Sequence, residues 1–361
     1  MITQRQKVSE NSFAGQPIYV GIDAHLRQWR VSVVTSEVFY KTFSQQPSCE
    51  KLNEYLRQNF PGATYFSAYE VGFCGFSVHR ELTKLGINSI VVNPGDIPTK
   101  DKERCQKEDA RDSRKIAQTL RSGELKGIYV PSEKNQQDRQ FLRTREKIVK
   151  DLKRNKSRVK MLLYFQGIQY PDRFENRGHW SKKFIEWLEG LEFPYETGKW
   201  ELQAHLDMVK HQRGLLLKVT RQIRELSRRP EYKDDVELLR SVPGIGLLTA
   251  MKILTELERI DRFEDFDNLC SYVGLVPSTR SSGERQIDRG ITPRTNPHLR
   301  WSLIESAWVA IHSDTALLAH YQQLKKRMDG NKAIVRIAKK LLRRMVHVLR
   351  EREPYVKGII R

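Results

Sequence analysis

The sequence of 361 residues has few cysteines, no apolar leader and no long apolar segment. Its four cysteines are scattered without CxxC spacing, so the sequence indicates neither a disulfide framework nor a zinc ribbon. The N-terminal stretch MITQRQKVSENS lacks the apolar centre of a signal peptide, and no run approaches the roughly 18 apolar residues of a membrane span. We therefore expect reduced thiols, no membrane partner and a cytoplasmic protein. The cysteines are Cys49, Cys74, Cys105 and Cys270.

Acidic residues are outnumbered by basic ones, 44 against 64, which gives a formal net charge of +20 and a pI near 9.8. Such a charge is far from typical of a metabolic enzyme and favours a polyanionic partner, with nucleic acid as the leading candidate. The length predicts two or three domains and is ample for a buried core.

Four carboxylates form the most informative pattern. Asp23 ends the apolar run IYVGID and Glu70 ends TYFSAYE, so both follow predicted strands. Asp109 and Asp112 lie three apart at the start of a predicted helix, where they share a face. Carboxylates that converge from separate elements suit Mg²⁺ and phosphoryl transfer. Each residue alone could equally be a structural cap. Together they predict a metal-dependent nuclease core with one or two Mg²⁺ ions.

The first domain, 16–131, has the pattern of an α/β fold. Three short strands (18–23, 29–35 and 38–43) are followed by a helix (49–59), a strand (64–70), a helix (76–85) and a strand (87–92). This βββαβαβ order is RNase H-like, and the helix that begins at Asp109 would place Ile116 and Leu120 against the sheet.

The second region, 132–233, is basic and all-helical in pattern. Apolar residues recur at steps of three, four and seven over 133–165 and again over 202–223, as in a coiled coil. The two seams predict either a hairpin that packs within one chain or a dimerisation arm. The segment between them is rich in aromatics, Gly and Pro, and we expect a loop with short helices.

The third region, 234–361, is mainly helical and opens with SVPGIGLLTA. Pro243, Gly244 and Gly246 predict a tight turn of a helix-hairpin-helix, in which glycines and helix N-terminal amides approach a phosphate. The same turn could be a plain connector. The final predicted helix, about 332–349, places Lys339 and Arg343 on a basic face, which either contacts nucleic acid or is solvated.

A polar segment of this region is predicted to be a flexible loop with Ser281 and Ser282 beside Gly283. A serine between basic residues can attack a phosphodiester, because neighbouring cations stabilise the anionic transition state. Arg280, Arg285 and Arg289 are the candidate cations. Loop composition alone also explains Ser and Gly at these positions.

Several motifs in order make the chain resemble the DEDD transposases of insertion-sequence family 110, whose relatives include the Piv-type DNA invertases. They run from YVGIDAH, EVGFCG and KEDARDSRKIA to SVPGIGLLTA, YVGLVPS, SSG and RTNPHLRWSLIESAW, and cover nearly all of the chain. The resemblance implies a RuvC-like domain, a coiled coil and a C-terminal transposase domain. It also implies a bacterial, nucleoid-associated recombinase that acts on donor and target DNA, guided by a structured (bridge) RNA from the same mobile element.

Carried over by position, the family's metal tetrad is Asp23, Glu70, Asp109 and Asp112. The nucleophile becomes Ser282, with Ser281 as the close competitor, and composite sites form in a homodimer or homotetramer. The chain departs from the family pattern at Ser113, where Ala is usual, and at Thr295, where Gly is usual. We expect the Ser113 change to be small and compatible with a surface position.

Two alternatives use parts of the same pattern. A RuvC-type endonuclease or Holliday junction resolvase would use the tetrad to activate water and would not need the serines. A non-catalytic nucleic-acid-binding protein would explain the basic helices but not four converging carboxylates.

Overall fold

The computed structural model describes residues 13–97, 109–175, 180–282, 285–291 and 295–357. The chain divides into two compact units, Met1–Pro131 and Ser132–Arg361, which are considered separately below. In the part of the chain that the structure describes, no helix is both long and apolar enough to cross a membrane.

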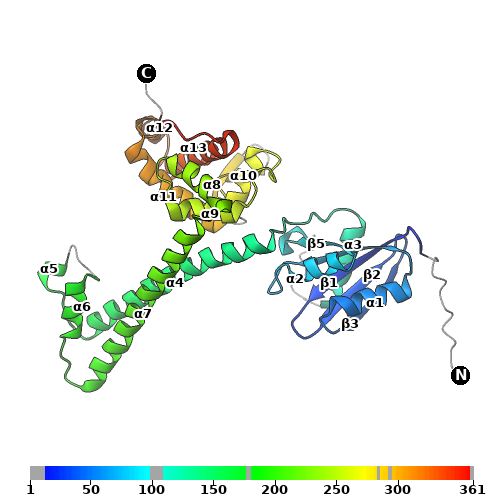
Figure 1. Cartoon of the computed structure of the whole chain (residues 1–361), viewed down its shortest axis with the longest axis horizontal. Helices are drawn as coiled ribbons and strands as arrows, with labels where there is room; N and C mark the ends of the chain where they lie inside the picture. The colour runs from blue at the N-terminus through cyan, green and yellow to red at the C-terminus, as the bar shows by residue number, and fades with distance from the viewer. Residues whose placement is uncertain (1–12, 98–108, 176–179, 283–284, 292–294, 358–361) are drawn as a thin grey trace. The chain divides into compact units, whose positions relative to one another are not determined.

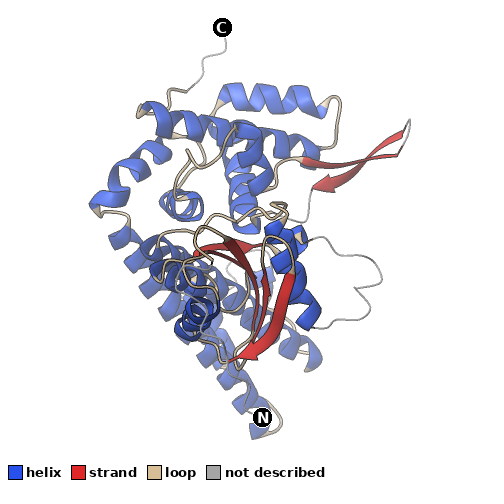
Figure 2. Cartoon of the chain, turned by 90° about the vertical axis from the view of Figure 1, so that its right-hand side faces the viewer, coloured by secondary structure: helices blue, strands red, loops and turns tan. Residues whose placement is uncertain are grey.

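The first unit contains a mixed five-stranded sheet in the order β3-β2-β1-β4-β5. β1 and β2 are antiparallel, as are β2 and β3, whereas β4 is parallel to both β1 and β5. This arrangement confirms the predicted βββαβαβ order and is compatible with an RNase H-like domain (Figures 1 and 2). The elements are β1 Pro17–Ala24, β2 Trp29–Val34, β3 Phe39–Gln45, α1 Cys49–Asn59, β4 Thr64–Glu70, α2 Ser77–Lys84, β5 Asn88–Val92, η1 Pro94–Asp96 and α3 Asp109–Arg121.

Alternation along the strands gives the sheet two different faces. Ile18, Val20 and Ile22 of β1 pack in one core with side chains of α1 and α2. The intervening positions of β1 face α3, which approaches at Gly21. A Cβ at Gly21 would lie 2.0 Å from the carbonyl oxygen of Ser113, so only glycine allows this contact.

The predicted long helices are confirmed as α4 Glu133–Phe165 and α7 Glu196–Leu226. They pack against each other in antiparallel fashion, because Arg145 contacts Thr220 while Asn155 contacts Gln212. At the far end, α5 Asp172–Glu175, α6 Lys182–Glu189 and an aromatic cluster complete the arm (Figure 1). The apolar seams therefore meet within one chain.

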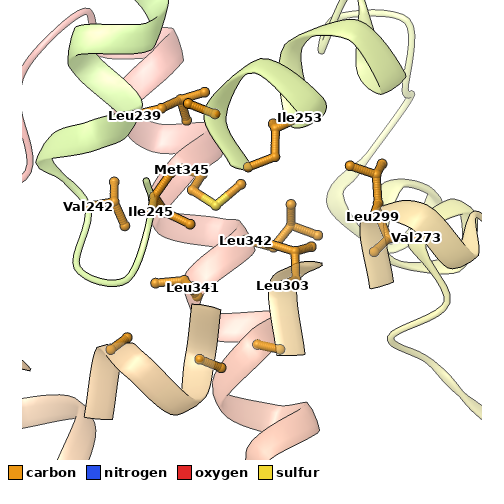
Figure 3. Close-up of a cluster of buried hydrophobic side chains, with 14 of the residues drawn as sticks. Leu239, Val242, Ile245, Ile253, Val273, Leu299, Leu303, Leu341, Leu342 and Met345 are labelled. Carbon is orange, nitrogen blue, oxygen red and sulfur yellow. The ribbon is translucent and has the colours of Figure 1, made fainter. Parts of the chain in front are cut away.

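The remaining helices form a bundle with a large apolar core. Side chains such as Leu239, Ile253, Leu303 and Leu342 converge on it from four helices (Figure 3). The helices are α8 Pro230–Ser241, α9 Leu247–Leu257, α10 Phe266–Val273, α11 Pro297–Ser313, α12 Thr315–Lys325 and α13 Gly330–Glu351.

The serine segment is not the loop that we predicted. Its backbone forms two antiparallel strands, β6 Pro277–Ser282 and β7 Arg285–Ile291, which extend from the bundle (Figure 2). The prediction failed because ladder hydrogen bonds stabilise this hairpin, whereas the polar sequence has no apolar alternation to announce it.

Candidate functional site

Asp23 and Glu70 lie at the carboxyl ends of adjacent parallel strands. Ile22 pairs with Tyr69, so the next residues of the two strands, Asp23 and Glu70, lie beside each other. Ile22 and Tyr69 both face the core with α1 and α2. By alternation, the two carboxylates lie on the opposite face, the one that α3 covers.

The direction of α3 brings its first turn to the same edge. The hydroxyl of Ser113 contacts that of Ser32 at 2.9 Å, and Ser32 pairs with Gly21 in the middle of β1. Two turns later, Arg121 donates to the carbonyl of Glu37, in the turn that follows β2 and lies near the start of β1. The helix therefore runs opposite to β1, with the turn that carries Asp109 and Asp112 toward the strand ends.

Ser113 corrects the expectation of a surface position. It is fully buried between α3 and the sheet, where it bonds to Ser32, whose hydroxyl also contacts Thr42 at 2.6 Å. A hydroxyl at this position is accommodated because polar side chains of β2 and β3 face it.

The carboxylate edge offers hard oxygen ligands of the kind that Mg²⁺ prefers. Asp23 is about one-fifth exposed and contacts Nε2 of His25 at 3.1 Å, a neighbour that the sequence reasoning did not single out. Glu70 is exposed and Asp112 is half-buried. Among the described side chains, no group of three or more His, Cys, Asp or Glu is close enough to hold a metal, and the Asp109 side chain lies outside the described part. The donor chemistry fits the cation, while a complete ligand shell remains a prediction.

The two glycines of the α8–α9 turn have different surroundings. Gly244 has a φ of +82°, and a Cβ there would lie 2.2 Å from the carbonyl oxygen of Ser306 in α11. Close helix packing therefore accounts for this glycine without a ligand. Gly246 is exposed at the N-cap of α9, and a Cβ there would meet nothing within 4 Å. Of the two, Gly246 is the position open to a phosphate.

The candidate nucleophiles lie at the end of β6, where Ser281 pairs with Gln286 and Ser282 with Arg285. Arg280 is on the same strand and Arg289 is on β7. The structure brings these residues together on one hairpin through their backbones. Their side chains lie outside the described part.

A buried polar cluster, which we call the hairpin clamp, joins the two ends of that hairpin. It consists of Arg143, Glu256, Tyr272 and Asn296. Arg143 donates to both carboxylate oxygens of Glu256, from Nε at 2.6 Å and Nη2 at 2.7 Å, and Asn296 donates to Oε2 at 2.8 Å. The backbone N–H of Asn296 also donates to the backbone carbonyl of Tyr272 at 2.8 Å. Tyr272 precedes β6 and Asn296 follows β7, so the clamp fixes the base of the hairpin.

The clamp residues Arg143, Glu256 and Tyr272 carry no local sequence pattern that predicts their association. Glu256 is only 3% exposed, and a buried carboxylate requires charged or hydrogen-bonding partners. The one local signal is Asn296 before Pro297, a usual start of a helix, and its side chain does accept from the Leu299 amide.

Lys339 and Arg343 of α13 have partners within the bundle. Nζ of Lys339 lies 2.9 Å from Oδ1 of Asp267, and the Arg343 guanidinium lies 4.6 Å from the Phe266 ring centre. Both therefore pack on the first turn of α10. Any contact with nucleic acid would compete with these exposed interactions.

Two family models match the chain. Residues 20–166 match the DEDD transposase model of IS110 elements, and residues 236–322 match the model of the transposase IS116/IS110/IS902 family. The chain belongs to the IS110 family of transposases. The first match contains Asp23, Glu70, Asp109 and Asp112, and the second contains the α8–α9 turn and the serine hairpin.

Curated relatives agree with the IS110 assignment. The chain is 32% identical over 244 residues to a putative transposase, y4qE, of Sinorhizobium fredii, a match that spans 68% of this chain and 58% of that protein. It is 26% identical over 302 residues to the transposase for insertion sequence element IS1533 of Leptospira borgpetersenii. That match spans 81% of this chain and 84% of that protein. The chain is also 25% identical over 285 residues to the transposase for insertion sequence element IS1111A of Coxiella burnetii. That match spans 74% of this chain and 73% of that protein.

Proposed function

We propose that this IS110-family transposase is a site-specific DNA recombinase that cuts and rejoins strands through a serine–DNA intermediate. The observation that carries the proposal is the carboxylate edge. Asp23 and Glu70 end adjacent strands on one face, and the first turn of α3 is directed to that edge. The match to a DEDD transposase model over the same residues supports this interpretation.

In the proposal, Asp23, Glu70, Asp109 and Asp112 hold one or two Mg²⁺ ions. Bound there, Mg²⁺ supplies charge stabilisation for the scissile phosphate and favours ionisation of an attacking hydroxyl. His25, 3.1 Å from Asp23, would hold that carboxylate in a fixed orientation.

The serine of the hairpin, Ser282 or its neighbour Ser281, would form an ester bond to phosphorus as the bond from phosphorus to the 3′ oxygen breaks. The serine proton is lost to solvent and the leaving oxygen gains a proton. A 3′-hydroxyl of the partner strand then reverses the attack and releases the serine. The number of phosphodiester bonds is conserved, so no nucleotide cofactor is needed. Arg280, Arg285 and Arg289 would stabilise the anionic transition state.

The three regions of the chain would have separate roles in this reaction. A RuvC-like domain (16–131) would hold the metal, the arm (132–233) would serve as a coiled coil for dimerisation, and a transposase domain (234–361) would carry the helix-hairpin-helix and the serine. Donor and target DNA would contact Gly246 and the basic residues Lys339 and Arg343, with Gly244 shaping the turn. A structured guide RNA and a homodimer or homotetramer complete the assembly, which would act in the bacterial cytoplasm at the nucleoid.

The test is a denaturing gel of purified protein with Mg²⁺, RNA transcribed from the flanking noncoding DNA, and labelled donor junction. Wild type is compared with Ser281→Ala, Ser282→Ala and Asp109→Ala. Ser278→Ala, also in β6, is the matched control. We expect a slow covalent protein–DNA band that is lost in one serine variant and in Asp109→Ala but kept in the control. Cleaved DNA without an adduct, unaffected by both serine variants, would leave a water-using endonuclease instead.

A further inference from the structure

The outer side of α4 has a concentrated positive charge. The second unit contains 46 of the 64 Lys and Arg residues of the chain and 30 of its 44 acidic residues, so most of the excess lies there. Between Lys147 and Lys160, seven residues are Lys or Arg and one, Asp151, is acidic. The partner helix α7 is closer to balance, with six basic and four acidic residues. The charge is therefore a property of α4 and not of the arm as a whole.

These cations lie on the side of α4 that faces away from α7. Leu152, Asn155 and Val159 are buried on the α7 side. With 3.6 residues per turn, the opposite side carries Lys147, Lys150, Lys153 and Arg154. Arg158 lies at the edge of that side, where it donates to Oδ1 of Asn155 at 2.8 Å, and all five residues are exposed. We call these five residues the basic face.

The basic face has little countercharge of its own. Within the described residues, Arg154 is the one member of the face that forms an ion pair, with Asp151 at 3.1 Å, and the two side chains are 65% and 47% exposed. Exposed pairs of this kind contribute little and are screened by salt. Five like charges on one helix repel one another, so a polyanion would relieve this repulsion.

The dimensions fit one strand of a nucleic-acid duplex. The span from Lys147 to Arg158 is about 17 Å at 1.5 Å per residue. One strand presents a phosphate about every 3.4 Å, so about five phosphates fall within that length. Immediately beyond the face, Met161, Tyr164 and Phe165 are 58%, 52% and 88% exposed, so no other part of the described chain covers this side of the helix end.

We infer that the basic face of α4 binds the phosphate backbone of a nucleic-acid duplex, so that the arm is a nucleic-acid surface. The inference rests on the proposed function only in that the chain acts on nucleic acid, and it is independent of the serine chemistry. DNA and structured RNA share this backbone, and the experiment separates them.

The decisive variant is Lys147→Gln/Lys150→Gln/Arg154→Gln in the full chain. The matched control removes three exposed cations from α7 by Lys218→Gln/Arg221→Gln/Arg224→Gln, which changes the net charge equally. Binding to a DNA duplex of arbitrary sequence and to an RNA duplex is measured over a range of salt concentrations. Thermal melts show whether each variant folds as the wild type does.

We expect the α4 variant to lose about 10- to 100-fold in affinity at about 0.15 M salt, with the slope of log K against log salt reduced by up to about 3. The α7 control should stay within about threefold of wild type, because its charges face no phosphates in this scheme. Weakening on DNA alone assigns the face to DNA, weakening on RNA alone assigns it to RNA, and weakening on both supports a shared backbone site.

Equal losses in the α4 and α7 variants, or no loss in either, would overturn the inference, because only net charge or other surfaces would then matter. If the wild type binds neither duplex, the inference fails, whereas the proposed function is judged separately by the covalent adduct. If the wild type binds and forms the covalent adduct while the α4 variant behaves identically, the inference alone fails.

Discussion

Replacing Glu256 by Gln tests whether the hairpin clamp has the energetic weight that its geometry implies. Three N–H groups point at the carboxylate, two from Arg143 and one from Asn296. A glutamine offers one oxygen and one NH₂ group, so its NH₂ group must face a donor whichever way the amide is turned. The variant therefore loses charge-assisted bonds and leaves buried donors without an acceptor.

The expected loss in the free energy of unfolding is about 3 kcal/mol. It comes from the 3–5 kcal/mol typical of breaking a buried ion pair, taken at the lower end because the Arg143 side chain is 35% exposed and water can reach it. For a unit of this size, about 3 kcal/mol lowers the melting temperature by roughly 6–12 °C.

The assay combines thermal melts of the full chain with amide hydrogen exchange. Exchange should accelerate in α10 and in the first turn of α11, which the clamp joins, while the sheet of the first unit keeps its protection. Adding Arg143→Met to Glu256→Gln should cost less than the sum of the two single changes, because the second change removes the unpaired charge. Additive costs, or a glutamine variant as stable as the wild type, would refute this account of the clamp.

Three further changes test the first unit and the bundle. Gly21→Ala places a Cβ 2.0 Å from the Ser113 carbonyl oxygen, so α3 must shift. We expect urea denaturation to show a free energy of unfolding lower by about 1–3 kcal/mol. The variant should also lose DNA cleavage while it retains DNA binding. Ser113→Ala should lower the free energy of unfolding, measured in the same way, by only about 1 kcal/mol, because the Ser32 hydroxyl keeps its contact with Thr42. Burial alone would raise the pKa of Asp314, but bonds from Tyr355 and Leu317 and the charge of Arg344 lower it overall. Because the folded pKa lies below the unfolded one, this stabilisation is full at neutral pH and lost on acidification. Melting temperatures should therefore fall more steeply below about pH 4 in wild type than in Asp314→Asn.

The sequence alone determined most elements of secondary structure. Alternating apolar residues located β1 and β4, and heptad-like spacing located α4 and α7. The structure confirms the bounds of β4 and α4, whereas α7 extends beyond the predicted 202–223 at both ends. Such patterns predict secondary structure from the sequence because they depend on residues that are close together in the chain. The same patterns predicted that Asp23 and Glu70 lie at strand ends. The tetrad's role in metal binding stays a prediction.

Tertiary structure decided what those elements do to one another. Ser113 is buried against the sheet, and the polar serine segment forms a hairpin. Gly244 packs closely against α11. The clamp depends on Arg143 and Glu256, which are 113 residues apart. Such contacts leave no local periodicity in the sequence, because a buried polar group gains its partner only when distant elements pack together.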